Sequence, residues 1–154
     1  MIIHRLLEKP YIYNLSQKVL SVIAFGNKGI GNFLKDELGS SSDTVLDVGC
    51  GTGRYADIFG KRYTGIDPND EYIEHARANH RGNFLVADCA NLQKAGKQFD
   101  TVLCVNTFHH LNNEQIRNTA NEMKAVAKKS IYIIDPVYPI KIIFDLKLPI
   151  FFII

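Results

Sequence analysis

Every second residue is a glycine at positions 49, 51 and 53, directly after the apolar run that holds Asp47. Glycine is used where the backbone needs a positive φ, or where a ligand comes so close that a Cβ would collide with it. A helix that starts at such a turn points its unpaired N–H groups and the positive end of its dipole at the ligand. The spacing therefore predicts a strand–turn–helix corner that binds a nucleotide-like ligand.

Polar side chains stand at or just past the carboxyl ends of four predicted strands: Asp47, Asp67, Asp88 and Asn106. In open α/β sheets ligands bind at this edge. Asp67 follows Asp47 by 67 − 47 = 20 residues, close to the interval of about 20 at which an acidic residue binds ribose hydroxyls. The alternatives are that Asp67 complements a helix dipole and that Asp88 caps the segment after it.

Two adjacent histidines, His109 and His110, follow the fourth predicted strand. With an ordinary pKa near ~6.5, they are the candidate catalytic bases of this loop for a hydroxyl or an acidic carbon. The alternative is that one of them packs and the other binds backbone carbonyls. A histidine pair without a third ligand nearby does not indicate a metal, so no metal site is predicted.

Alternating strands and helices position these residues. Apolar runs predict strands over residues 44–48, 63–66, 84–87, 99–105 and 131–134. Apolar periodicity and caps predict helices over residues 13–25, 30–38, 54–60, 70–79 and 113–128. This alternation predicts an α/β fold with a doubly wound, mostly parallel sheet, preceded by a helical lead-in.

The run Asp47-Val48-Gly49-Cys50-Gly51-Thr52-Gly53 resembles the first motif of the class I S-adenosylmethionine-dependent methyltransferases, with the spacing G-x-G-x-G. A dinucleotide site usually has the spacing G-x-G-x-x-G, and residue 54 here is arginine. The resemblance implies a Rossmann-like methyltransferase fold and S-adenosylmethionine as cofactor. It also implies methyl transfer to a small-molecule acceptor, with an apolar acceptor as one option.

The resemblance further implies which residues bind the cofactor. In it, Asp67 binds the ribose and Asp88 accepts from the adenine amino group, with the N–H of Cys89 facing the ring. Asp47 orients the methionine end of the cofactor, and the N–H groups of the glycine loop face its carboxylate. The cofactor-binding set is Asp47, Gly49, Cys50, Gly51, Gly53, Asp67, Pro68, Asp88, Cys89 and Asn106.

Two other function classes stay open. The first is an S-adenosylmethionine-binding protein or subunit without catalysis of its own. The second is a nicotinamide-dependent oxidoreductase, which the G-x-G-x-G spacing and the absence of a Tyr-x-x-x-Lys pair disfavour. Methylases of nucleic-acid bases carry a D/N-P-P-aromatic run after the fourth strand, whereas Asn106 here is followed by neither proline. The net charge of +2, with scattered basic residues, also predicts no nucleic-acid partner.

Length and composition predict one domain of 154 residues, with a lead-in over 1–42, a cofactor-binding core over 43–136 and an apolar tail over 137–154. The three cysteines have no C-x-x-C spacing, which predicts neither a disulfide framework nor a zinc site and suits a cytoplasmic location. No signal peptide is expected, because charged residues interrupt the apolar N-terminus.

The tail is where the sequence departs from the resembled family. That family has seven strands, of which the last two form an antiparallel hairpin, but only 154 − 134 = 20 residues follow Ile134. We therefore expect the last two strands to be missing, because they need a longer segment. The tail is too short and too charged to cross a bilayer. We expect it to fold back over the fifth strand or to form a homo-oligomer contact, and Pro149 predicts an outermost strand.

Overall fold

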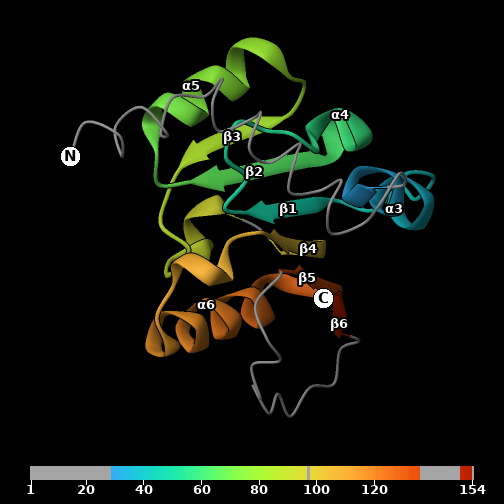
Figure 1. Ribbon diagram of the computed structural model, residues 1–154. Coiled ribbons are helices and arrows are strands. Elements are labelled where there is room, and N and C mark those ends of the chain that lie inside the picture. Colours follow the sequence, from blue (N-terminus) through green and yellow to red (C-terminus); the bar gives the residue numbers. More distant parts are fainter. Residues whose placement is uncertain (1–28, 97, 136–149, 154) are drawn as a thin grey trace.

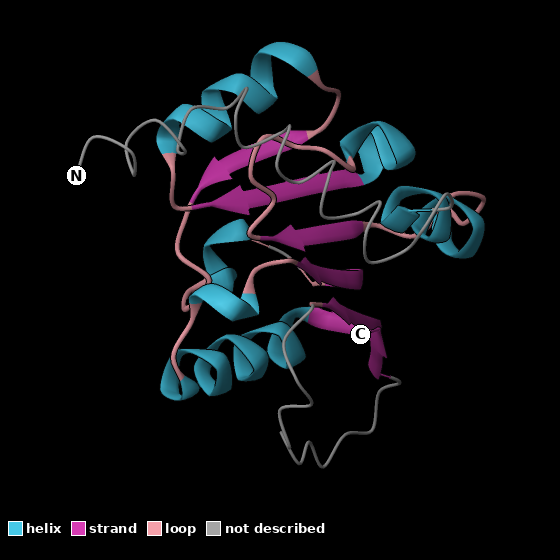
Figure 2. Ribbon diagram, in the orientation of Figure 1, coloured by secondary structure: helices cyan, strands magenta, loops and turns pink. Residues whose placement is uncertain are grey.

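The computed structural model describes residues 29–96, 98–135 and 150–153, which form a sheet with helices on both sides (Figure 1). The six strands are all parallel. Their spatial order is β3 (Asn83–Val86), β2 (Tyr63–Asp67), β1 (Val45–Val48), β4 (Phe99–Val105), β5 (Ala127–Ile134) and β6 (Ile150–Ile153) (Figure 2). The chain moves outward from β1 to β3 and then returns to the other side of β1. The switch point between β1 and β4 is the place where ligands bind in such sheets.

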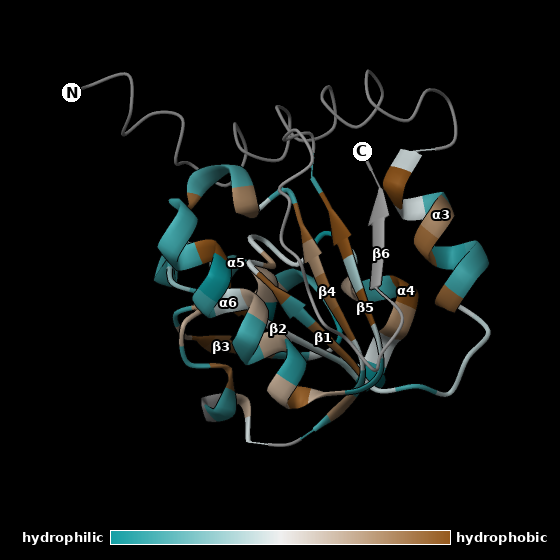
Figure 3. Ribbon diagram, turned by 90° about the horizontal axis from the view of Figure 1, so that it is seen from below, coloured by the Kyte–Doolittle hydropathy of each residue, from teal (hydrophilic) through white to brown (hydrophobic). Residues whose placement is uncertain are grey.

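Helices cover both faces of this sheet. The helices and 3-10 turns are α3 (Gly29–Leu38), α4 (Ala56–Phe59), η2 (Gly60–Arg62), α5 (Asp70–Asn79), η3 (Leu92–Ala95), η4 (Phe108–His110) and α6 (Asn113–Val126). Successive residues of a strand point to opposite faces. Leu103 of β4 accordingly packs in one core with α3, α4 and α5, and Val102 packs in the other core with α6. In Figure 3 much of β4 and β5 has the hydrophobic colour, whereas the helices carry both hydrophobic and hydrophilic residues. The predicted doubly wound α/β architecture is confirmed.

Two asparagines start the long helices. The Asn69 side chain accepts from the N–H of Tyr72 at 3.2 Å at the start of α5, as its position after the second strand predicts. At α6, Asn112 accepts from the N–H of Gln115, whose side chain accepts from the N–H of Asn112. This capping box satisfies backbone donors that have no partner within the helix.

Three predicted boundaries differ from the structure. The helix expected to run to residue 128 ends at Val126, and β5 begins at Ala127 rather than at Ile131. Ala127 has extended dihedral angles and pairs with Phe99, so the sheet overrides the helical preference of this segment. The helix after the glycine turn contains only four residues, Ala56–Phe59. The helix predicted over residues 13–25 lies outside the described residues.

The outermost strand on one side is β6, which pairs with β5 in the register Ile131↔Ile150 to Ile134↔Ile153. This confirms the expectation that the tail folds back over the fifth strand and supplies an edge strand. The pairing is parallel, in contrast to the antiparallel hairpin that the resemblance implies for the end of the sheet. A homo-oligomer contact through the tail stays a prediction. Among the described residues no helix has the length and apolar character needed to cross a membrane.

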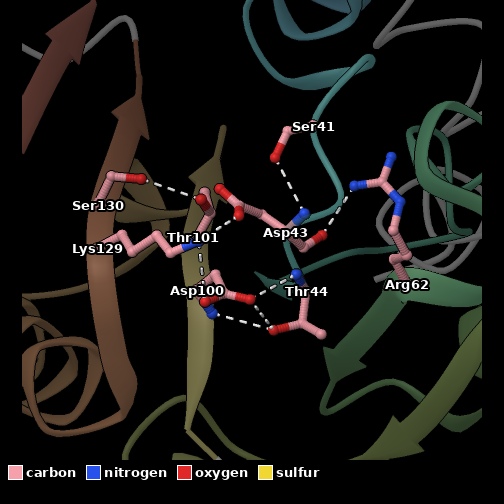
Figure 4. Close-up of polar contacts among 8 residues, drawn as sticks. All are labelled: Ser41, Asp43, Thr44, Arg62, Asp100, Thr101, Lys129 and Ser130. Carbon is pink, nitrogen blue, oxygen red and sulfur yellow. Dashed lines mark hydrogen bonds and ion pairs between the residues drawn. The ribbon is translucent and has the colours of Figure 1, made fainter.

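A polar cluster joins the strands at the amino edge of the sheet, where the parallel strands begin (Figure 4). Asp100 on β4 accepts from the backbone N–H of Thr44 at 3.0 Å and from its hydroxyl at 2.9 Å. The Lys129 ammonium on β5 lies 2.5 Å from Asp43 and 3.4 Å from Asp100. Arg62, which ends η2, donates to the Asp43 carbonyl at 2.8 Å. These five residues, here called the amino-edge cluster, link β1, β4 and β5 with the turn before β2.

Candidate functional site

The glycine loop between β1 and α4 has the left-handed backbone that its sequence predicts. The φ angles are +75° at Gly49, +54° at Gly51 and +81° at Gly53. A Cβ on Gly49 would lie 2.3 Å from the Oγ1 of Thr107, and one on Gly53 would lie 2.9 Å from the ring of Phe84. At these two positions the glycine is therefore required by its own φ and by close packing within the protein.

The backbone N–H groups of the loop bond mainly within the protein. Those of Gly49 and Cys50 both donate to the Ile66 carbonyl at 2.9 Å, and that of Gly53 donates to the Cys50 carbonyl at 3.0 Å. The expectation that these N–H groups face a ligand carboxylate is therefore wrong for these three residues. The reason is that the loop crosses the end of β2 and completes its hydrogen bonds there. The four-residue α4 is also too short to support the predicted contribution of a helix dipole.

Asp67, the last residue of β2, connects this loop to the start of α5. Its Oδ2 accepts from the N–H of Gly51 at 2.9 Å, and its Oδ1 accepts from the N–H of Asn69 at 2.9 Å. The side chain is largely buried, and burial raises its pKa above the ordinary value, while the two backbone hydrogen bonds oppose that shift. Since each carboxylate oxygen has a second lone pair, both can still accept from a ligand hydroxyl.

Asp47 lies one residue before the end of β1 and is 1% exposed. Its Oδ2 accepts from the hydroxyl of Tyr63 at 2.6 Å. Burial raises the pKa of the Asp47 carboxyl to about 7, the Tyr63 hydrogen bond lowers it, and the charge of Asp67 raises it further. Because burial disfavours the charged form of Asp47, a cation bound beside it would favour its ionisation.

Asp47 lines a pocket at the switch point of the sheet. The pocket walls come from the β1 end, the glycine loop and the β4 end: Asp47, Gly49, Cys50, Arg54, Tyr55, Val105 and Asn106. Asn106 has a φ of +52° and is the one non-glycine residue with a positive φ among residues 29–96, 98–135 and 150–153. Its backbone N–H donates to the Ile134 carbonyl at 2.8 Å. The structure therefore brings together four predicted site residues in one pocket, and the strained backbone of Asn106 lies at its wall.

The predicted adenine-binding residues lie farther along the same edge. The Asp88 side chain is exposed after β3 and accepts from the N–H of Ala90 at 2.9 Å. This bond supports the turn before η3, so Asp88 does accept from a backbone N–H, as the capping alternative expects. The segment that follows is a 3-10 turn that begins at Leu92, and not a helix directly after Asp88. Cys89 is partly buried and its Sγ accepts from the hydroxyl of Thr119 on α6 at 3.2 Å. Pro68 is exposed between β2 and α5.

The two histidines lie on η4, where the β4 loop passes the end of β5. The backbone N–H of His109 donates to Asp135 Oδ2 at 3.3 Å, and the ring Nδ1 of His109 lies 3.2 Å from both oxygens of Asp135. The rings of His109 and His110 are 3.9 Å apart between centroids. Burial lowers the pKa of His110, as does the charge of His109, while Asp135 and Asp67 oppose this effect. His109 therefore binds a carboxylate rather than the backbone carbonyl of the alternative interpretation.

Two residues of this site were not predicted from the sequence. Tyr63 opens β2 like an ordinary strand aromatic, and Asp135 follows the fifth strand, whereas the predicted histidine loop follows the fourth. Tyr63 contacts Asp47, which is 16 residues away in the sequence, and Asp135 contacts His109, which is 26 residues away. The sign available in the sequence was that Asp135 also stands at the carboxyl end of a strand. Among the described residues, no group of three or more His, Cys, Asp or Glu side chains is placed to hold a metal ion.

Comparison with known families gives one match over the core of the fold. A family model described as "Methyltransferase domain" matches residues 45–130, which is 86 of the 154 residues. The matched segment begins with β1 and ends within β5, so it includes the glycine loop, Asp67, Asp88 and the two histidines.

Curated relatives match parts of longer proteins. The chain is 29% identical over 109 residues to probable tRNA methyltransferase 9B of Mus musculus, which covers 70% of this chain and 22% of that protein. It is 30% identical over 105 residues to an O-methyltransferase of Pyrenophora dematioidea, and the match covers 60% of this chain and 39% of that protein. It is 28% identical over 107 residues to a ubiquinone biosynthesis O-methyltransferase of Coxiella burnetii, with 62% and 45% covered. The chain thus spans from about a fifth to under half of the lengths of these relatives.

Solved structures show the same architecture. A TehB-like S-adenosylmethionine-dependent methyltransferase from Corynebacterium glutamicum has a TM-score of 0.58 at 21% identity, covering 75% of this chain and 66% of that one. Magnesium protoporphyrin IX methyltransferase from Synechocystis, with bound S-adenosylmethionine, has a TM-score of 0.53 at 19% identity, with 65% and 56% covered. At these identities the likeness concerns the fold, and it confirms the predicted Rossmann-like arrangement.

Proposed function

We propose that this chain, which belongs to the methyltransferase domain family, transfers the methyl group of S-adenosylmethionine to a hydroxyl oxygen of a small molecule. The observation that carries the proposal is the carboxyl edge itself. There, Asp67 holds the glycine loop at Gly51, and the Asp47 pocket opens beside it at the switch point of the sheet. Nicotinamide-dependent oxidation, the less favoured alternative, has no support from the family match.

The residues present fit S-adenosylmethionine. Asp67 keeps lone pairs for two neighbouring ribose hydroxyls while it holds Gly51 and Asn69. Asp47 supplies a carboxylate on the pocket wall for the ammonium group at the amino-acid end, although Arg54 lines the same pocket. Asp88 is exposed at the outer part of the edge, where it can accept from an adenine amino group. When bound, the cofactor supplies a sulfonium methyl group that needs little activation, so the protein acts mainly by positioning and by excluding water.

The His109–Asp135 contact supports a hydroxyl acceptor. Because Asp135 binds Nδ1 of His109, the ring is held in the tautomer that leaves Nε2 without a proton. Nε2 could then take the proton of the acceptor hydroxyl. Asp135 would also stabilise the imidazolium that this proton transfer forms. Burial lowers the pKa of His110, which favours its neutral form, and its ring lies beside that of His109.

A small molecule is favoured over a nucleic acid as the acceptor. The chain resembles O-methyltransferases as well as a probable tRNA methyltransferase, so its relatives leave the substrate class open. The net charge of +2 provides little attraction to phosphate backbones. The loop after β4 also lacks the prolines that accompany methylation of base amino groups, as Thr107 and Phe108 follow Asn106.

The test measures transfer of a radioactive methyl group from S-adenosylmethionine to two acceptor pools. One pool is a set of small phenols and aliphatic alcohols, and the other is total tRNA. We expect label in the small-molecule pool. Label in tRNA alone would contradict the acceptor class. Cofactor binding by calorimetry without transfer to either pool would favour the alternative of a binding protein or subunit without catalysis of its own.

The role of His109 is tested in the same assay once an acceptor is found. His109→Gln should lower kcat by about 100-fold or more, the usual contribution of a general base, and should leave the affinity for S-adenosylhomocysteine unchanged. His110→Gln is the matched control, because it changes the neighbouring ring and leaves the contact between His109 and Asp135 intact. It should lower kcat much less. Equal turnover of the wild type and of both single variants and the double variant would remove the catalytic assignment.

A further inference from the structure

Tyr63 occupies an unusual place for an aromatic residue at the start of a buried strand. Its side chain is fully buried in the core that faces α3, α4 and α5. The hydroxyl group nevertheless reaches Asp47 Oδ2 at 2.6 Å, next to the pocket. A buried tyrosine hydroxyl needs a hydrogen-bond partner, and this one has the site carboxylate as its partner.

Gly65 makes this reach possible. It follows Tyr63 by two residues, so both residues face the same side of β2, and it pairs with Asp47 across the β1–β2 ladder. A Cβ on Gly65 would lie 2.7 Å from the Sγ of Cys50 and 2.9 Å from Cε1 of Tyr63. The space without a side chain at Gly65 is therefore filled by the Tyr63 ring from one direction and by the Cys50 thiol from the other.

The ring of Tyr63 is also held from its sides. It stacks on Phe59 at 6.1 Å between centroids with an interplanar angle of 9°, and it lies 5.6 Å from the ring of Phe84. These contacts fix the direction of the phenol. With the ring fixed, the hydroxyl restricts the orientation of the Asp47 carboxylate, because its Oδ2 is bound from one direction.

We propose that Tyr63 is a positioning residue of the cofactor site: through its hydroxyl it aims the Asp47 carboxylate at the ammonium group of the bound amino-acid moiety, and Gly65 provides the space for it. This rests on the proposed function. Burial by itself favours the neutral form of Asp47, and the Tyr63 hydrogen bond is the interaction within the protein that opposes it most directly. Tyr63 thus supports the anionic form as well as its direction.

The experiment compares two ligands on the full chain by calorimetry. S-adenosylhomocysteine carries the amino-acid moiety, and 5′-methylthioadenosine has the same nucleoside without it. Tyr63→Phe should weaken S-adenosylhomocysteine about 10-fold, the loss expected for a hydrogen bond to a charged group, and should change the affinity for 5′-methylthioadenosine by less than about 2-fold. Tyr132→Phe removes a hydroxyl group from the same core on β5, away from β2, and is the matched control that should keep both affinities.

A second variant disturbs the same contact through Gly65 instead of through the hydroxyl. Gly65→Ala should displace the ring and give the same selective loss of S-adenosylhomocysteine, with a lower melting temperature than Tyr63→Phe because its Cβ overlaps two neighbours. Equal weakening of both ligands by Tyr63→Phe, or no weakening of either, would overturn the role of Tyr63. A wild-type chain that binds neither ligand would overturn the proposed function itself, and this inference with it.

Discussion

The two edges of the parallel sheet use the same residue type in opposite ways. At the carboxyl edge, Asp47 is buried, its pKa is raised to about 7, and it bonds to a neutral hydroxyl. At the amino edge, Asp100 is accessible to water, its pKa is lowered to about 2 by hydrogen bonds from Thr44, and Lys129 lies beside it. The amino edge satisfies its charges within the protein, whereas the carboxyl edge keeps a buried carboxylate that a ligand cation can complete. The difference agrees with a structural role for the amino edge and with the proposed binding role of the carboxyl edge.

The largest effect on stability is expected at the glycine loop. Gly49→Ala should destabilise the fold by about 2–4 kcal/mol, because a left-handed φ disfavours a Cβ and the Cβ would overlap Thr107. Gly60→Ala is the matched control: its φ is +58°, but no atom lies within 4 Å of the added Cβ. It should cost only about 1–2 kcal/mol. Urea denaturation of both variants measures the difference, and equal losses would show that the Thr107 contact has no effect.

The two edges should respond to pH in opposite directions. Because the pKa of Asp47 is raised on folding, its contribution to stability is complete below its unfolded pKa of 3.8 and is lost as the pH rises through about 7. Asp47→Asn should therefore gain stability relative to the wild type between pH 5 and pH 8. Asp100 has the opposite sign, since its pKa is lowered, so its contribution is present above pH 3.8 and is lost as the pH falls through about 2.

Urea denaturation at several pH values checks both signs. The difference between Asp100→Asn and the wild type should stay constant from pH 5 to pH 8, which makes this variant the control for Asp47→Asn. A constant difference for Asp47→Asn over the same range would break the contrast between the edges, because Asp47 would then titrate alike in the folded and unfolded chain.

The smallest effect is expected for the ion pairs of the amino-edge cluster. Lys129 is 58% exposed at its side chain, and water and salt weaken its attraction to Asp43 and Asp100. Lys129→Gln should lower the melting temperature only slightly at low salt, and the difference should vanish at 1 M NaCl. A large loss that persists at high salt would mean that the cluster stabilises the sheet through more than screened charges.

The sequence predicts this fold well where local patterns decide it. The mostly apolar run at residues 99–105 is β4. Alternate residues of the strands face opposite sides of the sheet, and helices pack on both sides. The start of β5 is not predictable from the sequence, because Ala127, Lys128 and Lys129 have no strand character of their own and become extended by pairing with β4. The parallel β6 was not predictable either, because its direction depends on a long-range pairing that residues 150–153 do not encode locally.

In the candidate site, too, the sequence predicts what local patterns decide and not what long-range contacts decide. The strand ends predicted Asp47, Asp67, Asp88 and Asn106 as edge residues, because parallel strands end together. The sequence could not show that the loop N–H groups are used by Ile66, since that depends on how the loop crosses β2. It also could not show the Tyr63–Asp47 and His109–Asp135 contacts, which join neighbouring strands or loops and require the register of the sheet.

The most direct test of the central claim is calorimetry of S-adenosylmethionine binding to the wild type and to Asp67→Ala. Asp67 holds Gly51 and, in the proposed complex, offers its lone pairs to the ribose, so the variant should bind about 10-fold to 100-fold more weakly and should also be less stable. Asp88→Ala, at the exposed outer end of the edge, should weaken binding less and keep the stability of the wild type. Binding by the wild type with this order of losses is the predicted result. A folded wild type that does not bind S-adenosylmethionine, or an unchanged affinity in Asp67→Ala, would contradict the account.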